Sequence, residues 1–213
     1  MSDLELFVDS FWISPYAFTA FVALTEKGLA FDVRPVALNT HEQDAPAFRD
    51  ATVTGRVPAL RHGDFWLAES AAIVDYLDDA FPDAPRALPN DVKDRARARQ
   101  LLGWIRSDLG ALREERSTAT MFYGKATAPL TKAGEAAAAK LARVAEAVVP
   151  ADRDALFGGG FCVADADLAF MLHRLILNGH EVPARVRAFA DRVWQRPSVR
   201  AFVAHERIPF EPY

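Results

Sequence analysis

The spacing at which apolar residues repeat along the chain changes once, between residues 82 and 90. This change limits the folds that the chain can adopt. Before that point, short apolar runs alternate with polar residues or flank a glycine-containing turn. Beyond residue 90, apolar residues recur at helical spacings of three and four, and no strand pattern competes. The chain therefore predicts a small mixed α/β domain followed by an all-helical domain.

The first segments predict a strand, a loop and a helix. Residues 4–8 alternate in the manner of a short strand. Ser14 has the chemistry of a helix N-cap, and Pro15 has the fixed φ that suits the first helical position. Gly28 provides the conformational freedom of a helix stop. Both ends of a helix over residues 15–27 are thus marked.

The remainder of residues 1–82 predicts strand, loop, strand, strand and helix. The second strand covers residues 31–38, and Pro35 limits it to an edge or irregular role. Residues 57–61 and 65–68 form a hairpin, and a helix follows over residues 69–81. This βαβ-ββα order predicts a four-stranded mixed sheet with helices packed on it, in one domain over residues 1–82.

The second domain is expected over residues 90–213, after a proline-rich linker at 83–89. Residues 163–177 are apolar nearly all the way round, so this helix should be buried among the others. Two further helices, 183–194 and 197–205, each start with a proline at or near the first position.

Composition excludes several classes of protein. The 25 basic and 29 acidic residues and the 51% apolar content describe a globular chain. No run reaches the roughly 18 apolar residues of a membrane span, and the start lacks a signal-peptide pattern, so a cytoplasmic protein is expected. Cys162 is the single cysteine, and the five histidines lack metal-ligand spacing. We expect neither a disulfide framework nor a bound metal.

Charge is divided unevenly along the chain. Residues 1–85 carry 5 basic and 14 acidic side chains, a net −9, whereas residues 86–213 carry 20 and 15, a net +5. This mild, interleaved excess of basic residues is too weak for a nucleic-acid-binding surface, and no nucleic-acid partner is expected.

The order of elements, together with four short motifs, resembles the glutathione transferase family. These motifs are Ser-Pro-Tyr at 14–16, Gly-Arg-Val-Pro-Ala-Leu at 55–60, Glu-Ser-Ala-Ala-Ile at 69–73 and Ala-Asp at 164–165. The resemblance spans essentially the whole chain, and the stretch 95–116 is most similar to the bacterial YfcF-type transferases. It implies a thioredoxin-like first domain that binds glutathione and an all-helical second domain.

Two roles are possible for the side chain of Ser14. As an N-cap alone, its hydroxyl would contribute about 1 kcal/mol of stability. The resemblance implies a catalytic role, in which the hydroxyl donates a hydrogen bond to the sulfur of bound glutathione. Because the helix N-terminus also favours negative charge, the thiol, with a free pKa of about 8.5, would ionise more readily there.

The Val57–Pro58 motif implies glutathione binding through the backbone. Pro58, a structural residue in this reading, would form a cis peptide bond, and the Val57 N–H and C=O would pair with the cysteinyl part of the ligand as an added strand does. A trans proline in an ordinary loop is the alternative. Arg56 stands near the expected glycyl carboxylate, where a charge pair competes with a solvated arginine, and His41 is a weaker candidate for that carboxylate.

Glu69 and Ser70 lie at the start of the third helix. Acidic and hydroxyl residues there commonly cap a helix. The resemblance assigns them instead to the zwitterionic γ-glutamyl end of glutathione. Ser70 and the helix N-terminus would bind the carboxylate, and Glu69 the ammonium group.

The acceptor substrate is expected between the segment at 11–12 and a long fourth helix. Aromatic side chains there would bind apolar electrophiles by burial, which leaves the substrate's identity open. The candidate residues are Phe11, Trp12, Trp104, Arg106, Asp108 and Arg113.

Asp165 and Cys162 have a structural reading. Relatives start the central helix with a Ser/Thr-x-x-Asp capping box, and Cys162 departs from that pattern. We expect Asp165 to reach back to the backbone N–H of residue 162 by itself, and Cys162 to be a buried side chain rather than a nucleophile.

The resemblance implies a cytoplasmic glutathione S-transferase that activates the glutathione thiolate, with glutathione as substrate and no metal. The activated sulfur would be conjugated to an electrophile in detoxification, or would reduce a peroxide. A non-catalytic binding module of the same fold is the main alternative, and a glutathione-dependent isomerase or dehalogenase is the enzymatic one. Family members pair as two-fold dimers, so a homodimer is expected, with neither a membrane nor a nucleic-acid partner.

Overall fold

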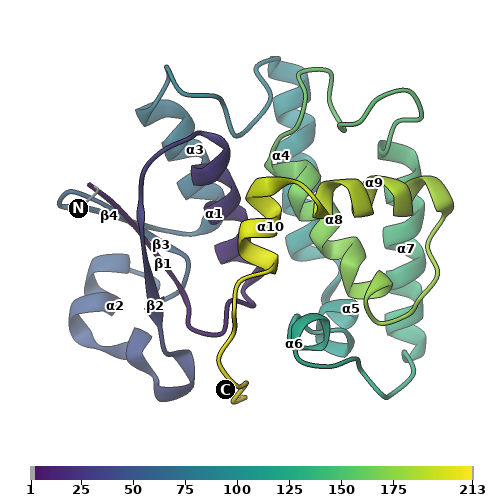
Figure 1. Ribbon diagram of the computed structural model, residues 1–213, viewed down its shortest axis with the longest axis horizontal. Coiled ribbons are helices and arrows are strands. Elements are labelled where there is room, and N and C mark those ends of the chain that lie inside the picture. The colour runs from purple at the N-terminus through teal and green to yellow at the C-terminus, as the bar shows by residue number, and fades with distance from the viewer. Residues whose placement is uncertain (1–2, 213) are drawn as a thin grey trace. The chain divides into compact units, whose positions relative to one another are not determined.

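The structure, a computed structural model, describes residues 3–212 as two compact units. Within this range, the first unit combines residues 3–87 with residues 197–212, and the second is Leu88–Arg196. Figure 1 shows the elements of both, and each unit is described by itself below.

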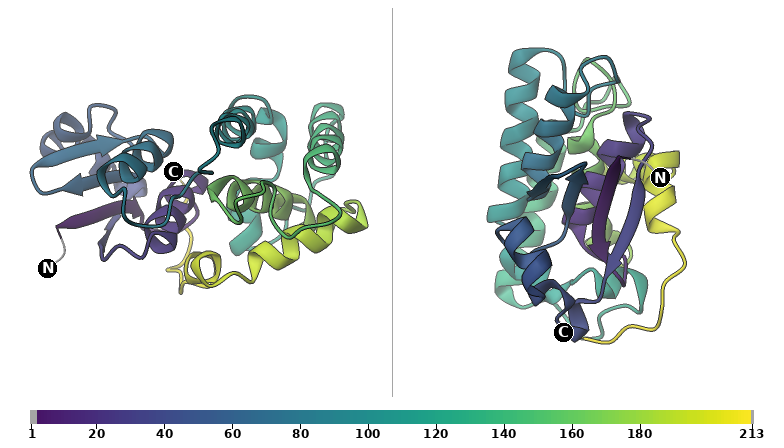
Figure 2. Two further views of the ribbon diagram at one scale, coloured as in Figure 1. Left: turned by 90° about the horizontal axis from the view of Figure 1, so that it is seen from above. Right: turned by 90° about the vertical axis from the view of Figure 1, so that its left-hand side faces the viewer.

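The first unit is built on a four-stranded mixed sheet, as the sequence predicts. The strand order is β2-β1-β3-β4, in which β1 and β2 are parallel and the other pairs antiparallel. Figure 2 shows the strands side by side. Pro35 lies on the edge strand β2, where its missing N–H costs the sheet no ladder bond. The strands are β1 (Leu4–Asp9), β2 (Asp32–Val36), β3 (Ala59–His62) and β4 (Phe65–Ala68).

Helices cover both faces of this sheet. The buried side chains of Leu6 and Val8 share one face of β1, the face on which α1 (Pro15–Glu26) and α3 (Ser70–Ala80) pack. Phe7 points to the other face and meets Phe48 of the short helix α2 (Pro46–Thr52) at a ring-centroid distance of 5.6 Å. The loop before α2 contains two short 3₁₀ turns, η1 (Leu38–Thr40) and η2 (Glu42–Asp44).

A buried ion pair fixes the end of α1. The Lys27 ammonium lies 3.1 Å from Asp78 of α3 and also donates to the carbonyl oxygens of Phe81 and Pro85. Asp78 in turn accepts the N–H of Ala87 at 2.7 Å. The proline-rich segment after α3 is therefore bound to the first unit, because its carbonyl and N–H groups satisfy charges that are buried there.

The second unit is entirely helical, and the helix at its centre is the one that the sequence predicts. All residues of α8 (Val163–Ile176) are buried, in agreement with its apolar surface. The other helices are α4 (Val92–Ser107), α5 (Gly110–Glu115), α6 (Ala119–Phe122), α7 (Lys132–Val148) and α9 (Ala184–Trp194). Among the described residues, no helix has the length and apolarity needed to cross a membrane.

Two boundaries differ from the sequence interpretation. The period at Leu102, Ile105, Leu109 and Leu112 suggests one long helix, but α4 ends at Ser107 and α5 begins at Gly110. Of the residues expected on the fourth helix, Asp108 is therefore only its C-cap and Arg113 lies on α5. Apolar spacing continues across this break because the four leucine and isoleucine side chains are buried on both sides of it. In addition, α10 (Pro197–Val203) and the segment after it group with the first unit rather than with the helical domain expected over 90–213. The reason is aromatic packing of Phe202 on Phe18 and Phe21 of α1.

Candidate functional site

The sheet register brings the predicted glutathione-site residues of the first unit to one end of the sheet. Phe7 of β1 pairs with Ala59 of β3, and Ala59 pairs with Ala68 of β4. The end of β1, the start of β3 and the end of β4 therefore lie at the same end of the sheet. Ser14 follows the first of these points, Val57 precedes the second, and Ser70 follows the third.

Ser14 is the N-cap of α1. Its hydroxyl oxygen accepts the N–H of Ala17 at 3.2 Å, and its carbonyl accepts that of Phe18 at 3.0 Å. Since a hydroxyl can accept and donate at once, the cap leaves its proton free to serve an outside acceptor. The side chain is half-buried. Capping and hydrogen bonding to a ligand are thus compatible, and the two readings of Ser14 do not exclude each other.

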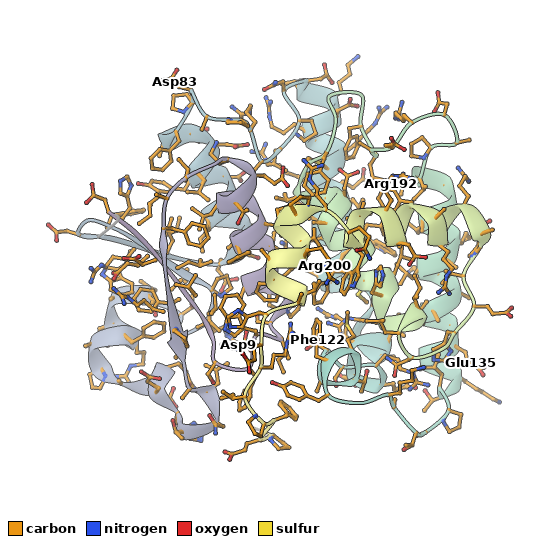
Figure 3. The ribbon with its side chains drawn as sticks, viewed as in Figure 1. Asp9, Asp83, Phe122, Glu135, Arg192 and Arg200 are labelled. Atoms are coloured by element: carbon orange, nitrogen blue, oxygen red, sulfur yellow. The ribbon has the colours of Figure 1, made fainter. Side chains whose placement is uncertain are left out.

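Asp9 organises the turn before α1 and was not among the predicted site residues. Its buried carboxylate accepts the N–H groups of Ile13 at 2.8 Å and of Ser14 at 2.9 Å, at the end of β1 (Figure 3). Burial raises the pKa of Asp9, whereas these N–H groups and the charge of Arg207 act in the opposite direction. The carboxylate thereby orients the backbone that carries Ser14.

The same turn is held from its other side by residues near the C-terminus. Trp12 has φ of 53°, a left-handed conformation that is strained for a bulky residue. The Arg207 guanidinium donates to the Trp12 carbonyl oxygen at 3.1 and 3.3 Å, and the imidazole ring of His205 stacks on the indole at 3.6 Å. Charge-assisted hydrogen bonds are worth about 1.5–3 kcal/mol, enough to offset such strain.

Val57 and Pro58 precede β3. The bond between them is cis, as the family resemblance implies. Val57 is half-buried, and within residues 3–212 its backbone N–H and C=O have no hydrogen-bond partner. Arg56 beside it is exposed, and His41 is exposed with its Nδ1 3.2 Å from Asp44.

Glu69 and Ser70 form the N-terminus of α3. Glu69 is exposed and has φ of 70°, and it makes no side-chain capping bond to the helix. Ser70 is buried as the first helical residue. A helix N-terminus with an adjacent exposed carboxylate can bind a ligand that carries both an anionic and a cationic group.

The predicted acceptor-site residues have partners of their own. Phe11 and Trp12 are only 1% and 6% exposed, and the rings of Phe210 and Phe202 pack on them in the first unit. In the second unit Trp104 donates to Asp108, which also pairs with Lys140, while Arg106 lies 3.3 Å from Asp167. The carbonyl of Arg113 accepts a guanidinium N–H of Arg174. The acceptor site stays a prediction.

Asp165 has the geometry of a structural residue. Its carboxylate accepts the N–H of Cys162 at 2.9 Å and the N–H of Leu156 at 2.7 Å, in a fully buried position. The expectation that Asp165 acts by itself is wrong, because the Cys162 side chain also faces the backbone N–H of Asp165 and both halves of the capping box are present. Burial and the neighbouring carboxylate raise the pKa of the Cys162 thiol, which disfavours the reactive thiolate. Among residues 3–212, no three His, Cys, Asp or Glu side chains are grouped so that they could hold a metal.

Two family models match the chain. Residues 13–80 match the glutathione S-transferase N-terminal domain, and residues 91–207 match the corresponding C-terminal domain. Glutathione S-transferase U13 of Arabidopsis thaliana is 36% identical over 88 residues, which are 41% of this chain and 39% of that protein. Probable maleylacetoacetate isomerase 2 of Drosophila melanogaster is 32% identical over 113 residues, 52% and 49% of the two chains. The chain thus spans less than half the length of either relative.

Solved structures match nearly the full chain. A glutathione transferase homolog from Burkholderia, with bound glutathione, is 38% identical with a TM-score of 0.78, and the match covers 94% of this chain and 96% of that one. The theta-class glutathione S-transferase of Xanthomonas axonopodis, also with glutathione bound, has a TM-score of 0.74 at 24% identity, over 97% and 99% of the chains. This second likeness supports the fold alone.

Proposed function

The chain belongs to the glutathione S-transferase family, and we propose that it binds glutathione at the sheet end of its first unit and ionises the glutathione thiol for reaction. The observation that carries this proposal is that the strand register brings Ser14, Val57 and Ser70 to the same end of the sheet. Glutathione bound to the 38% identical Burkholderia homolog supports the choice of ligand.

The proposed site assigns one part of glutathione to each group. The N-terminus of α3, with Ser70 and Glu69, holds the zwitterionic γ-glutamyl end. The backbone N–H and C=O of Val57, which have no hydrogen-bond partner among the described residues, pair with the cysteinyl amide, and Arg56 neutralises the glycyl carboxylate. Ser14 donates to the sulfur, beside the positive end of α1.

Catalysis in this proposal consists of positioning and thiolate stabilisation. The thiol proton leaves to solvent, and the sulfur lone pair attacks an electrophilic carbon, whose leaving group departs with the bonding electrons. Because no cysteine lies in residues 11–14, the protein itself forms no mixed disulfide there. Reduction of a peroxide by the same thiolate is the second reaction that this site could perform. We also propose that the protein belongs to the YfcF-type subgroup, acts in detoxification and is located in the cytoplasm.

Calorimetric titration with glutathione tests the binding proposal, with cysteinylglycine, which lacks the γ-glutamyl group, as the matched control ligand. We expect glutathione to bind and cysteinylglycine to bind at least tenfold more weakly, because α3 would lose its partner. Failure to bind glutathione would favour a non-catalytic module of this fold. Measuring glutathione consumption with an electrophilic substrate then separates a transferase, which consumes it, from an isomerase, which does not.

A further inference from the structure

A cavity of 370 Å³ lies in the second unit, where the loop between α7 and α8 approaches the end of α9. Three arginines line it: Arg153 from the loop, Arg192 from α9 (Figure 3) and Arg196 just after α9. We call this cavity the arginine pocket. None of the residues assigned above to glutathione belongs to it.

The guanidinium groups are held in place by the walls of the pocket. Arg153 donates to the carbonyl oxygens of Ala155 and Leu156 at 3.2 and 3.0 Å. Arg192 donates to the Asp154 carbonyl at 3.0 Å and lies 3.3 Å from its carboxylate. Arg196 lies over the ring of Phe161, 3.9 Å from its centroid. Arginines fixed in this way lose little side-chain freedom when they bind an anion.

The local charge is positive although the chain is acidic. Three guanidinium groups face one carboxylate among the lining residues, and the side chain of that carboxylate, Asp154, is 88% exposed. The chain as a whole carries a net −4. Since exposed carboxylates are well solvated, Asp154 offsets only part of the positive charge.

The remaining walls are apolar and open. Phe157 and Phe161 line the pocket with Gly158 and Gly160. Gly160 has φ of 95°, and no atom lies within 4 Å of the position that a Cβ would occupy at either glycine. The glycine backbone therefore leaves space next to the aromatic rings for a ligand.

We propose that the arginine pocket binds a small organic anion, a carboxylate or phosphate attached to a flat apolar body. Guanidinium forks match the oxygens of both anionic groups, and the two rings supply contact for the apolar body. The volume exceeds the needs of a bare oxyanion and lies within the range of small-molecule sites, about 300–1,000 Å³. This second site shares no residue with the proposed glutathione site.

Calorimetry on the full chain tests the proposal with phenyl phosphate and benzoate, compared with inorganic phosphate and with neutral phenol. We expect both aromatic anions to bind, phosphate to bind more weakly and phenol not to bind. Arg196→Gln should weaken the binding of phenyl phosphate at least tenfold, by loss of one charge-assisted contact. The control is Arg143→Gln, an exposed arginine of α7 outside the pocket, which should leave the affinity unchanged.

The aromatic anion should bind equally well in the presence of saturating glutathione. The outcome of this test therefore does not depend on whether glutathione itself binds. Arg153→Gln provides a second variant, and thermal unfolding of each variant shows that it is folded. The proposal is overturned if no aromatic anion binds, if glutathione displaces it, or if folded Arg196→Gln and Arg153→Gln both retain wild-type affinity. Equal affinity for inorganic phosphate would also contradict it, because the aromatic walls would then contribute nothing.

Discussion

Asp9 and Arg207 act on the same turn from opposite sides. Asp9 accepts the N–H groups of Ile13 and Ser14, and Arg207 donates to the carbonyl of Trp12. Together they fix two consecutive peptide groups before α1, those joining Trp12 to Ile13 and Ile13 to Ser14, which places the Ser14 hydroxyl at the helix end. We therefore regard Arg207 as a positioning residue for the proposed reaction.

Replacing Arg207 tests this role. Arg207→Gln should raise the pKa of the bound glutathione thiol and lower kcat roughly tenfold, with a smaller change in KM, because the turn relaxes while the binding residues remain. The control is Arg200→Gln, an exposed residue of α10 (Figure 3), which should change neither value. If Arg207→Gln lowered the melting temperature but left the thiol pKa unchanged, Arg207 would be structural only.

Glu69 and Ser70 give a second test at single residues. Glu69→Gln and Ser70→Ala should each weaken glutathione binding by about 1–3 kcal/mol, because each leaves a charged ligand group short of a partner. Asp64→Asn, an exposed turn residue of the first unit, is the matched control for lost negative charge. Calorimetry that gave wild-type affinity for both site variants would remove these two side chains from the proposed binding site.

The sequence could indicate Ser14, Val57 and Ser70, but not Asp9 or Arg207. The first three lie in short motifs at element boundaries. Asp9 looks like any polar residue at a strand end, and its role depends on the left-handed turn at Trp12. Arg207 lies 195 residues from its partner, so only the packing of α10 on α1 brings the two together.

Among the helices, the spacing of apolar residues in the sequence predicted those that have a continuous buried face. α8 begins and ends within a residue of the expected 163–177 because apolar residues cover nearly all of its surface. The break between α4 and α5 left no trace in the apolar spacing, and the return of α10 to the first unit depends on tertiary contacts of Phe202. Such contacts join distant segments and have no local signature.

The buried histidine of α8 makes stability depend on pH. The Nδ1–H of His173 donates to the Ala169 carbonyl oxygen, 2.8 Å away, and the imidazole ring stacks on Trp194 at a ring-centroid distance of 3.8 Å. Burial lowers the pKa of His173 below its ordinary 6.5. The unfolded chain therefore takes up a proton first as the pH falls, so this contribution to stability is fully present above pH 6.5 and is lost below it.

We expect the free energy of unfolding to fall between pH 7.5 and 5.5, by at most about 1.4 kcal/mol per pH unit for one such group. Lowered pKa values of His180 and His205, both caused first by desolvation, act in the same direction. Denaturant unfolding of His173→Gln should show a smaller loss than the wild type over this range. An identical pH slope in the variant would mean that His173 does not titrate differently on folding.

Taken as one chain, the molecule divides its charge between an acidic first part and a mildly basic second part. Family resemblance suggests a two-fold dimer, in which complementary charges would meet across the interface. Sedimentation should give about twice the chain mass of 23.5 kDa at micromolar concentration, and salt should promote dissociation. A monomer at low salt would contradict the dimer and would leave each proposed site to the residues of one chain.

The most direct test of the proposed function is an ultraviolet titration of the glutathione thiolate on the wild-type protein and on Ser14→Ala. A free thiol has a pKa of about 8.5. The wild type should lower it by one unit or more, and Ser14→Ala should return much of that shift and slow conjugation roughly 10- to 1000-fold, with little loss of binding. If bound glutathione kept its free pKa on the wild type, or if Ser14→Ala changed neither the pKa nor the rate, Ser14 would be only the cap of α1.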